Sequence, residues 1–159
     1  MSLVSLSRRL CVAAAILPFL ATAAGAVCIP AVFPATYLQD QENAGGHTIA
    51  RHVGKTDVQL VARLNADPNI ARASSYGPAA AAQADIIAAL TANSAAINAW
   101  ANAAGVATRD WNANAGHVTG RVASRPAGLG NIANTNNLKV VIRRTGLNAC
   151  FLLTSYPIP

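Results

Sequence analysis

The longest regular pattern of apolar residues lies in the middle of the chain, over residues 79–103. Its bulky apolar residues recur at steps of four, seven and three, which places on one helix face Ile86, Leu90, Ile97 and Trp100. The segment from Thr91 to Ser94 can divide this region into two helices, and Gly105 is a natural stop at its C-terminal end. The pattern therefore predicts a long helical region that presents an apolar stripe to a core.

Two shorter helices are predicted upstream of this region. Residues 47–52 can form one helical turn after a Gly-Gly break. Thr56 is a typical N-cap for a helix that runs to about residue 65. The apolar face of that helix is predicted to hold Val58, Val61 and Leu64.

The second half of the chain contains short runs that are typical of strands. Strands are predicted at residues 106–111, 117–122, 138–145 and 150–156. Gly146-Leu147-Asn148 is predicted to be the hairpin turn between the last two strands, and Pro157 is expected to end the last one. Loops are expected at residues 70–78 and 124–137. Helices followed by antiparallel strands predict an α+β fold.

The N-terminal residues have the pattern of a secretory signal peptide. Arg8 and Arg9 precede an apolar run, and residues 24–26 provide a small-x-small cleavage site. We expect residues 1–26 to be removed, residues 27–44 to form an extended arm and residues 45–159 to form one domain. The apolar run is too short to span a membrane comfortably. We therefore expect a secreted or periplasmic protein, with no stable membrane association after cleavage.

Signal cleavage would leave two cysteines, Cys28 and Cys150. An even number of cysteines in an exported protein favours one disulfide. That bridge would tie the N-terminal arm to the last strand. Two free thiols are the alternative.

The composition limits the chemistry that the chain can perform. Among 159 residues, Lys and Arg total 12 and Asp and Glu total 6, so the formal charge of +6 favours an anionic partner. The chain lacks HExxH, CxxC and any acidic cluster, so neither a metal site nor another cofactor is expected. It also lacks a Gly-x-Ser-x-Gly elbow and a Gly-rich phosphate loop, and Glu42 is its only glutamate. These absences disfavour paired-carboxylate hydrolysis and the common nucleotide-binding folds.

Basic and proton-transferring residues are concentrated in one short segment. Within seventeen residues the chain places His47, Arg51, His52, Lys55 and Arg63. RNA can be cleaved through its own 2′-hydroxyl by a base, an acid and cations, because the nucleophile belongs to the substrate. Histidine suits the proton transfers, and the arginine fork suits a phosphate.

The last predicted strand adds a pair of hydroxyl groups. Thr154 and Tyr156 share one strand face, from which both can donate hydrogen bonds to a phosphate. Ser155 is expected to face the other way, with Phe151 and Leu153.

Three short motifs in this order resemble one protein family. HTIARHVGKT, ASSY and the C-terminal LTSYP are similar to the bacterial ribonuclease A-like toxin domain found at the C-termini of contact-dependent growth inhibition toxins. The resemblance runs from about Gly45 to Pro157. It implies N-terminal helices, a curved antiparallel sheet and metal-independent cleavage of RNA. Members of that family commonly lack disulfides, so a bridge between Cys28 and Cys150 would be an addition.

The resemblance also implies roles for particular residues. His52 matches the catalytic histidine of the family, Arg63 the active-site arginine, and Thr154 and Tyr156 the pair on the last strand. His47 and Lys55 are weaker candidates for contacts with the substrate. The sequence does not decide which group is the second acid or base.

Three hypotheses follow from these residues. The first is an exported, monomeric ribonuclease that forms a 2′,3′-cyclic phosphate and spares DNA. The second is a non-catalytic exported module that binds RNA or a protein with the same fold. The third is a toxin that a cognate immunity protein blocks in the producing cell.

Overall fold

The computed structural model describes residues 27–159, so the predicted signal peptide at residues 1–26 lies outside the described residues. The helices are α1 (Tyr37–Asn43), α2 (Thr48–His52), α3 (Asp57–Ala66), α4 (Ala79–Ala92) and α5 (Ser94–Asn102). The strands are β1 (Arg72–Tyr76), β2 (Thr108–Asn114), β3 (Gly120–Ser124), β4 (Ile132–Thr135), β5 (Asn137–Gly146) and β6 (Ala149–Ile158). A short 3₁₀-helix, η1 (Leu129–Asn131), precedes β4. All helices but this one precede β2, which confirms the predicted α+β class.

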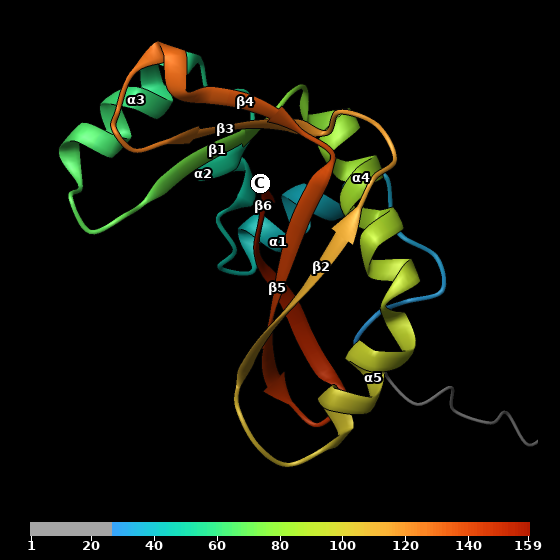
Figure 1. Cartoon of the computed structure of the whole chain (residues 1–159). Helices are drawn as coiled ribbons and strands as arrows, with labels where there is room; N and C mark the ends of the chain where they lie inside the picture. The colour runs from blue at the N-terminus through green and yellow to red at the C-terminus, as the bar shows by residue number, and fades with distance from the viewer. Residues whose placement is uncertain (1–26) are drawn as a thin grey trace, which may run out of the picture.

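The strands form two three-stranded sheets with antiparallel neighbours, in the orders β1-β3-β4 and β2-β5-β6. Figure 1 shows the two sheets at a steep angle, with α3 beside the first sheet and α4 and α5 along one face of the second. The two sheets meet at β6, where the Ser155 hydroxyl lies 2.6 Å from the Tyr76 hydroxyl of β1. The antiparallel strands were predicted to form one curved sheet, and the structure divides them into these two joined sheets.

The main core lies between α4, α5 and the second sheet. The predicted break in the long helical region is confirmed, because α4 ends at Ala92 and α5 begins at Ser94. The predicted apolar stripe is buried against alternate residues of β5, and this core includes Ile86, Leu90, Ile97, Leu138, Val140 and Ile142. Within residues 27–159, no helix is long and apolar enough to cross a membrane.

A second, smaller core lies under α3. The helix begins as predicted at Thr56, whose side chain accepts a hydrogen bond from the Gln59 N–H in a capping box. The predicted apolar face is confirmed at Leu64, which is fully buried, but it is wrong at Val58, which is 67% exposed, and the unpredicted Leu60 is fully buried. Both stripes have helical spacing, so the sequence pattern alone could not choose between them.

Two segments predicted to be irregular contain regular structure. The arm at residues 27–44 includes α1, whose Tyr37 and Leu38 are buried, although its two prolines and lack of period gave no helical signal. The predicted loop at 70–78 contains β1, which pairs with β3. The β1 sequence RASSY has few residues with strand propensity, yet every residue from Ala73 to Tyr76 is buried. Tertiary burial therefore decides the conformation of both segments.

The predicted C-terminal boundaries also change. The expected loop at 124–137 contains η1 and β4, and β6 continues through Pro157 to Ile158. Pro157 is tolerated because β6 is the edge strand of its sheet, where alternate N–H groups point away from the ladder.

The two cysteines of the described segment form a disulfide. Cys28 and Cys150 have Cα atoms 5.2 Å apart and are separated by 122 residues. The bridge joins the N-terminal segment to the beginning of β6.

Candidate active site

A cavity of about 710 Å³ opens where α2 and α3 face the strands of both sheets. Its lining includes His47, Arg51, His52, Arg63, Arg72, Ser74, Asn112, Lys139, Thr154 and Tyr156. The structure therefore brings together all four predicted catalytic residues, which lie far apart in the sequence, and His47 with them.

The His52 side chain is the best-defined proton-transfer group in this cavity. It is 8% exposed, and its Nδ1 lies 3.1 Å from the backbone carbonyl of Ser74. Because a carbonyl only accepts hydrogen bonds, we assign the proton to Nδ1, which leaves Nε2 as a proton acceptor. Burial lowers the pKa of His52 to about 4, and the charges of Arg63 and Arg51 act in the same direction. The imidazole is therefore neutral at pH 7 and suited to act as a base.

The helix that carries His52 is short and depends on contacts with neighbouring residues. α2 has five residues, and the Glu42 carboxylate accepts hydrogen bonds from the N–H groups of Ile49 and Ala50, each at 2.9 Å. A carboxylate at a helix N-terminus is favourable because free N–H groups point toward it. Gly46 allows the close approach of α1 and β6, since a Cβ there would lie 2.6 Å from the Leu152 carbonyl oxygen. The only glutamate of the chain thus orients the helix of the predicted base.

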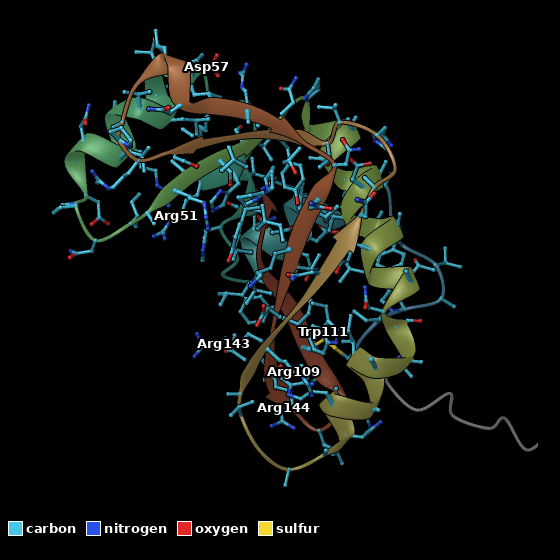
Figure 2. The ribbon with its side chains drawn as sticks, in the orientation of Figure 1. Arg51, Asp57, Arg109, Trp111, Arg143 and Arg144 are labelled. Atoms are coloured by element: carbon cyan, nitrogen blue, oxygen red, sulfur yellow. A yellow bond between two sulfur atoms is a disulfide. The ribbon has the colours of Figure 1, made fainter. Side chains whose placement is uncertain are left out.

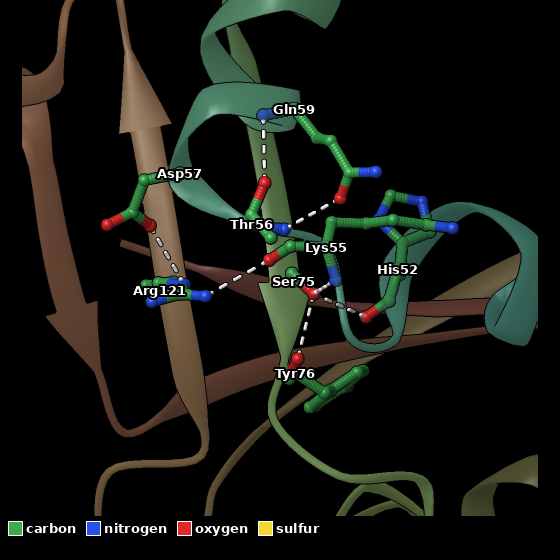
Figure 3. Close-up of polar contacts among 8 residues, drawn as sticks. All are labelled: His52, Lys55, Thr56, Asp57, Gln59, Ser75, Tyr76 and Arg121. Atoms are coloured by element: carbon green, nitrogen blue, oxygen red, sulfur yellow. Dashed lines mark hydrogen bonds and ion pairs between the residues drawn. The ribbon is translucent and has the colours of Figure 1, made fainter.

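The turn from α2 to α3 is fixed against the first sheet. Gly54 has φ of +67°, a left-handed conformation that glycine adopts without strain, and its N–H donates to the Tyr76 carbonyl at 3.2 Å. Figure 3 shows the Lys55 N–H donating to the Ser75 hydroxyl at 2.9 Å and the Arg121 guanidinium donating to the Lys55 carbonyl at 3.1 Å. These contacts fix the position of α3 relative to α2.

Arg63 lies on α3 and reaches back toward α2. Its Nη1 donates to the backbone carbonyl of Arg51 at 3.4 Å. Together with Arg51 and Arg72, which also line the cavity, Arg63 makes the cavity electropositive. Such a site favours an anion, and the planar guanidinium of Arg63 can bind a phosphate through two hydrogen bonds.

The opposite wall of the cavity comes from β6. Thr154 is 7% exposed, and its Oγ1 has no hydrogen-bond partner among residues 27–159. A buried polar atom without a partner is costly, so a hydroxyl in this position is suited to a ligand oxygen. The ring of Tyr156 lies beside that of His52, with 5.1 Å between their centroids.

A β-bulge on β6 explains why one predicted strand face is wrong. Leu152 pairs with Ile142 and Thr154 pairs with Val141, so Leu153 is an extra residue between two adjacent pairs. Leu152 and Ser155 are consequently both buried, whereas Ser155 was predicted to share a face with Phe151 and Leu153. Beyond the bulge, Thr154 and Tyr156 share a face as predicted.

Lys139 is a cavity residue that the sequence did not reveal. It pairs directly with Tyr156 across β5 and β6, and its Nζ lies 2.6 Å from the Asp110 carboxylate of β2. The hydrogen bond to Asp110 raises the pKa of Lys139, so its charge is retained. The alternation of side chains along the strand could have placed Lys139 on the sheet face that does not carry Leu138 and Val140. Only the register of β5 and β6 shows that Lys139 lies beside Tyr156.

The two weaker candidates occupy different positions. His47 is half-buried and lines the cavity, and burial followed by the charge of Arg51 lowers its pKa. Lys55 instead lines a neighbouring hollow of about 400 Å³, which it shares with Arg51 and Arg63. Within residues 27–159, no three His, Cys, Asp or Glu side chains are grouped so that they could hold a metal ion.

Comparison with known families identifies the domain. The sequence model of the bacterial CdiA-CT RNAse A domain matches residues 46–157. The chain belongs to this family. The match begins one residue before His47 and ends at Pro157, so it contains the predicted catalytic residues of the CdiA-CT RNAse A domain. Cys28 lies outside it.

A solved structure supports the same family assignment. The chain is similar to one in the crystal structure of a CdiA-CT/CdiI complex from Y. kristensenii 33638, with 28% sequence identity and a TM-score of 0.64. The similarity covers 72% of this chain and 100% of the other. A comparison with curated proteins gives no significant match.

Proposed function

We propose that this CdiA-CT RNAse A domain cleaves RNA without a metal, by attack of the 2′-hydroxyl of RNA on the adjacent phosphate. The observation that carries the proposal is the convergence of His52, Arg63, Thr154 and Tyr156 on one electropositive cavity. The family assignment supports ribonuclease activity, and the tautomer of His52 supports its role as the base.

The reaction begins with removal of the 2′ proton by Nε2 of His52. The 2′-oxygen then forms a bond to phosphorus while the bond from phosphorus to the 5′-oxygen breaks. The products are a 2′,3′-cyclic phosphate and a free 5′-hydroxyl, which takes up a proton. A substrate without a 2′-hydroxyl, such as DNA, cannot enter this reaction.

Positive charges and hydroxyl groups would stabilise the pentavalent phosphorane. Arg63 binds the non-bridging oxygens, and the unpaired hydroxyl of Thr154 donates a hydrogen bond to one of them. Lys139 adds positive charge from the neighbouring strand, where Asp110 holds its ammonium in place.

Tyr156 and His47 are the two candidates for protonation of the leaving oxygen. The lowered pKa of His47 reduces the fraction of its imidazole that carries a proton for donation at neutral pH. The hydroxyl of Tyr156 is a donor beside the ring of His52. We therefore assign the donor role to Tyr156.

We further propose that the domain is an exported toxin with a cognate immunity partner. The similar solved chain is in a complex of CdiA-CT with CdiI. Expression of residues 27–159 in the cytosol should be toxic, and co-expression of a neighbouring gene product should relieve the toxicity. Toxicity retained by His52→Ala would contradict a ribonuclease toxin.

The ribonuclease proposal is tested with purified residues 27–159, single-stranded RNA and EDTA. His52→Ala should lower the rate of RNA cleavage by about 10²- to 10⁴-fold, because it removes the base. Arg63→Ala should lower it by about 10²-fold or more. Arg109→Ala is the matched control, because it removes the same charge from an exposed β2 residue outside the cavity lining. Equal rates for Arg63→Ala and Arg109→Ala would contradict the assignment of Arg63.

A further inference from the structure

Three successive rows of side chains lead from the cavity along the face of the second sheet opposite α4 and α5. Directly paired residues of an antiparallel sheet project from the same face. The first two rows contain Asn112, Lys139 and Tyr156, and then Asp110, Val141 and Thr154. The third row contains Thr108, Arg143 and Phe151. The first two rows contribute four residues to the cavity lining, and the third row continues the same surface beyond it.

Arg143 is the charged residue of the third row. It is exposed, and no hydrogen bond or ion pair joins its guanidinium to another residue of the described segment. Figure 2 shows Arg143 projecting from the sheet on the same side as Arg51 of the cavity wall. The exposed Thr108 and the half-buried Phe151 flank it on the neighbouring strands. The row thus offers a permanently charged guanidinium, an aromatic ring and a hydroxyl group.

The surface between the cavity and the third row is short and, among the described residues, carries no uncompensated negative charge that would repel RNA. Rows on one face are two residues apart, or about 7 Å, which is comparable with the length of one extended nucleotide. The Asp110 carboxylate faces this path, but its charge is compensated by the Lys139 ammonium at 2.6 Å. The side chain between Lys139 and Arg143 on this face of β5 is Val141, which carries no charge.

We propose that Thr108, Arg143 and Phe151 form a subsite for a nucleotide beyond the cleaved bond, so that the preferred substrate is a single-stranded RNA longer than a dinucleotide. The Arg143 guanidinium would bind a phosphate, the Phe151 ring would stack on a base, and the Thr108 hydroxyl would contact a ribose. This inference rests on the proposed ribonuclease function.

Two neighbouring arginines, Arg144 and Arg109, do not share the exposed and unpaired position of Arg143. The Arg144 guanidinium donates to backbone carbonyls in the last turn of α5 and just after it, including those of Trp100 at 3.1 Å and Val106 at 2.9 Å, so its role is structural. Arg109 pairs with the buried Ile142 and lies over the Trp111 ring at 5.6 Å, on the face that packs against α5. Arg109 and Arg143 therefore sit at adjacent positions of one sheet but on opposite faces.

The test compares kcat/KM for a dinucleotide with kcat/KM for oligonucleotides extended by three nucleotides on the 5′ or the 3′ side. In the parent protein and in Arg109→Ala, extension on one side should raise kcat/KM by about tenfold. Arg143→Ala should lose most of this gain, which lowers the ratio of oligonucleotide to dinucleotide kcat/KM by about five- to tenfold. Phe151→Leu, which keeps an apolar side chain but removes the ring, should also lower the ratio.

Binding of labelled single-stranded RNA to the same variants in a His52→Ala background separates this inference from catalysis. If the parent cleaves RNA but Arg143→Ala behaves like Arg109→Ala at every length, the subsite is wrong and the proposed function stands. If the parent cleaves no RNA but Arg143→Ala still binds it about fivefold more weakly than Arg109→Ala does, the subsite stands and the catalytic proposal fails. An effect of Arg143→Ala on binding of an immunity protein alone would also overturn the subsite.

Discussion

At the scale of single residues, the properties of His52 follow from where its ring is buried. The Ser74 carbonyl accepts the Nδ1 proton, and burial together with the charge of Arg63 disfavours a second proton on the ring. Nε2 is therefore left as an acceptor. A base with a low pKa gives up driving force for proton transfer but is almost entirely in its reactive, neutral form at pH 7.

This arrangement predicts the acid side of the pH profile. The folded-state pKa of His52 is about 4, below the ordinary value of 6.5, so the base stays neutral until the pH falls close to 4. The kcat/KM for RNA cleavage should therefore decline near pH 4. Arg63→Ala removes a charge that lowers the pKa, so its residual activity should decline at a higher pH.

The measurement is kcat/KM against pH, with far-UV circular dichroism to confirm that the protein remains folded. A decline centred near pH 6.5 would mean that His52 titrates like an exposed imidazole. That result would contradict the role assigned to its burial.

The candidate site was predictable at this scale only in part. The residue types of His52, Arg63, Thr154 and Tyr156 could be identified because the motifs around them resemble a known family. Lys139 could not be identified, because its place beside Tyr156 depends on the pairing of two strands. Lys55 was a candidate because of its charge, but its side chain lines a different hollow.

At the scale of elements, a buried hydrogen-bond network links the three motifs that carry the family resemblance. Ser155 of β6 donates its backbone N–H to the Thr48 hydroxyl of α2 at 2.9 Å. Its hydroxyl donates to the Lys139 carbonyl at 2.8 Å and lies 2.6 Å from the Tyr76 hydroxyl of β1. Because Ser155 lies between Thr154 and Tyr156, this network fixes the wall of the cavity.

This network predicts a coupled effect on stability. Ser155→Ala removes the partner of the buried Tyr76 hydroxyl, so it should lower the free energy of unfolding by about 1–3 kcal/mol. Tyr76→Phe should also be destabilising. The double variant should lose less than the sum of the two, since no Tyr76 hydroxyl is then left without a partner. Urea unfolding of the four proteins measures this coupling, and additive losses would contradict it.

The pattern of apolar residues predicted some helices and strands better than others. α4 and α5 were predictable because Ile86, Leu90 and Ile97 recur at helical spacing on a buried face. β1 was not, because Ser74 and Ser75 resemble loop residues and become strand residues only through pairing with β3. The β6 bulge likewise left no signal in the alternation of apolar residues, so the prediction that Ser155 shares a face with Phe151 and Leu153 was wrong.

At the scale of the whole molecule, the cavity exists because two sheets meet at β6. The disulfide lies at the start of this strand and joins it to the N-terminal segment through Cys28, which is 9% exposed. The family match begins after Cys28, so the bridge adds a constraint from outside the matched residues. An oxidising compartment, as the predicted signal peptide implies, would preserve it.

The bridge predicts that stability depends on the redox state. Closing a loop of this length in the unfolded chain is worth about 4–5 kcal/mol in the chain-entropy model. Reductant should therefore lower the Tm of the oxidised protein. The control is the double variant Cys28→Ser/Cys150→Ser, which should have the lower Tm and be insensitive to reductant. Equal Tm values for the oxidised parent and this double variant would contradict a stabilising bridge.

The central claim, that this cavity cleaves RNA through the 2′-hydroxyl of RNA, is tested most directly with one chemically modified substrate. An oligoribonucleotide and its copy with 2′-deoxy at every cleaved position are incubated with residues 27–159 in EDTA, and the product ends are determined by mass spectrometry. We predict cleavage of the first to 2′,3′-cyclic phosphate and 5′-hydroxyl ends, and no cleavage of the second. Cleavage of the deoxy-substituted copy, or 5′-phosphate ends that form only with added metal, would contradict the account.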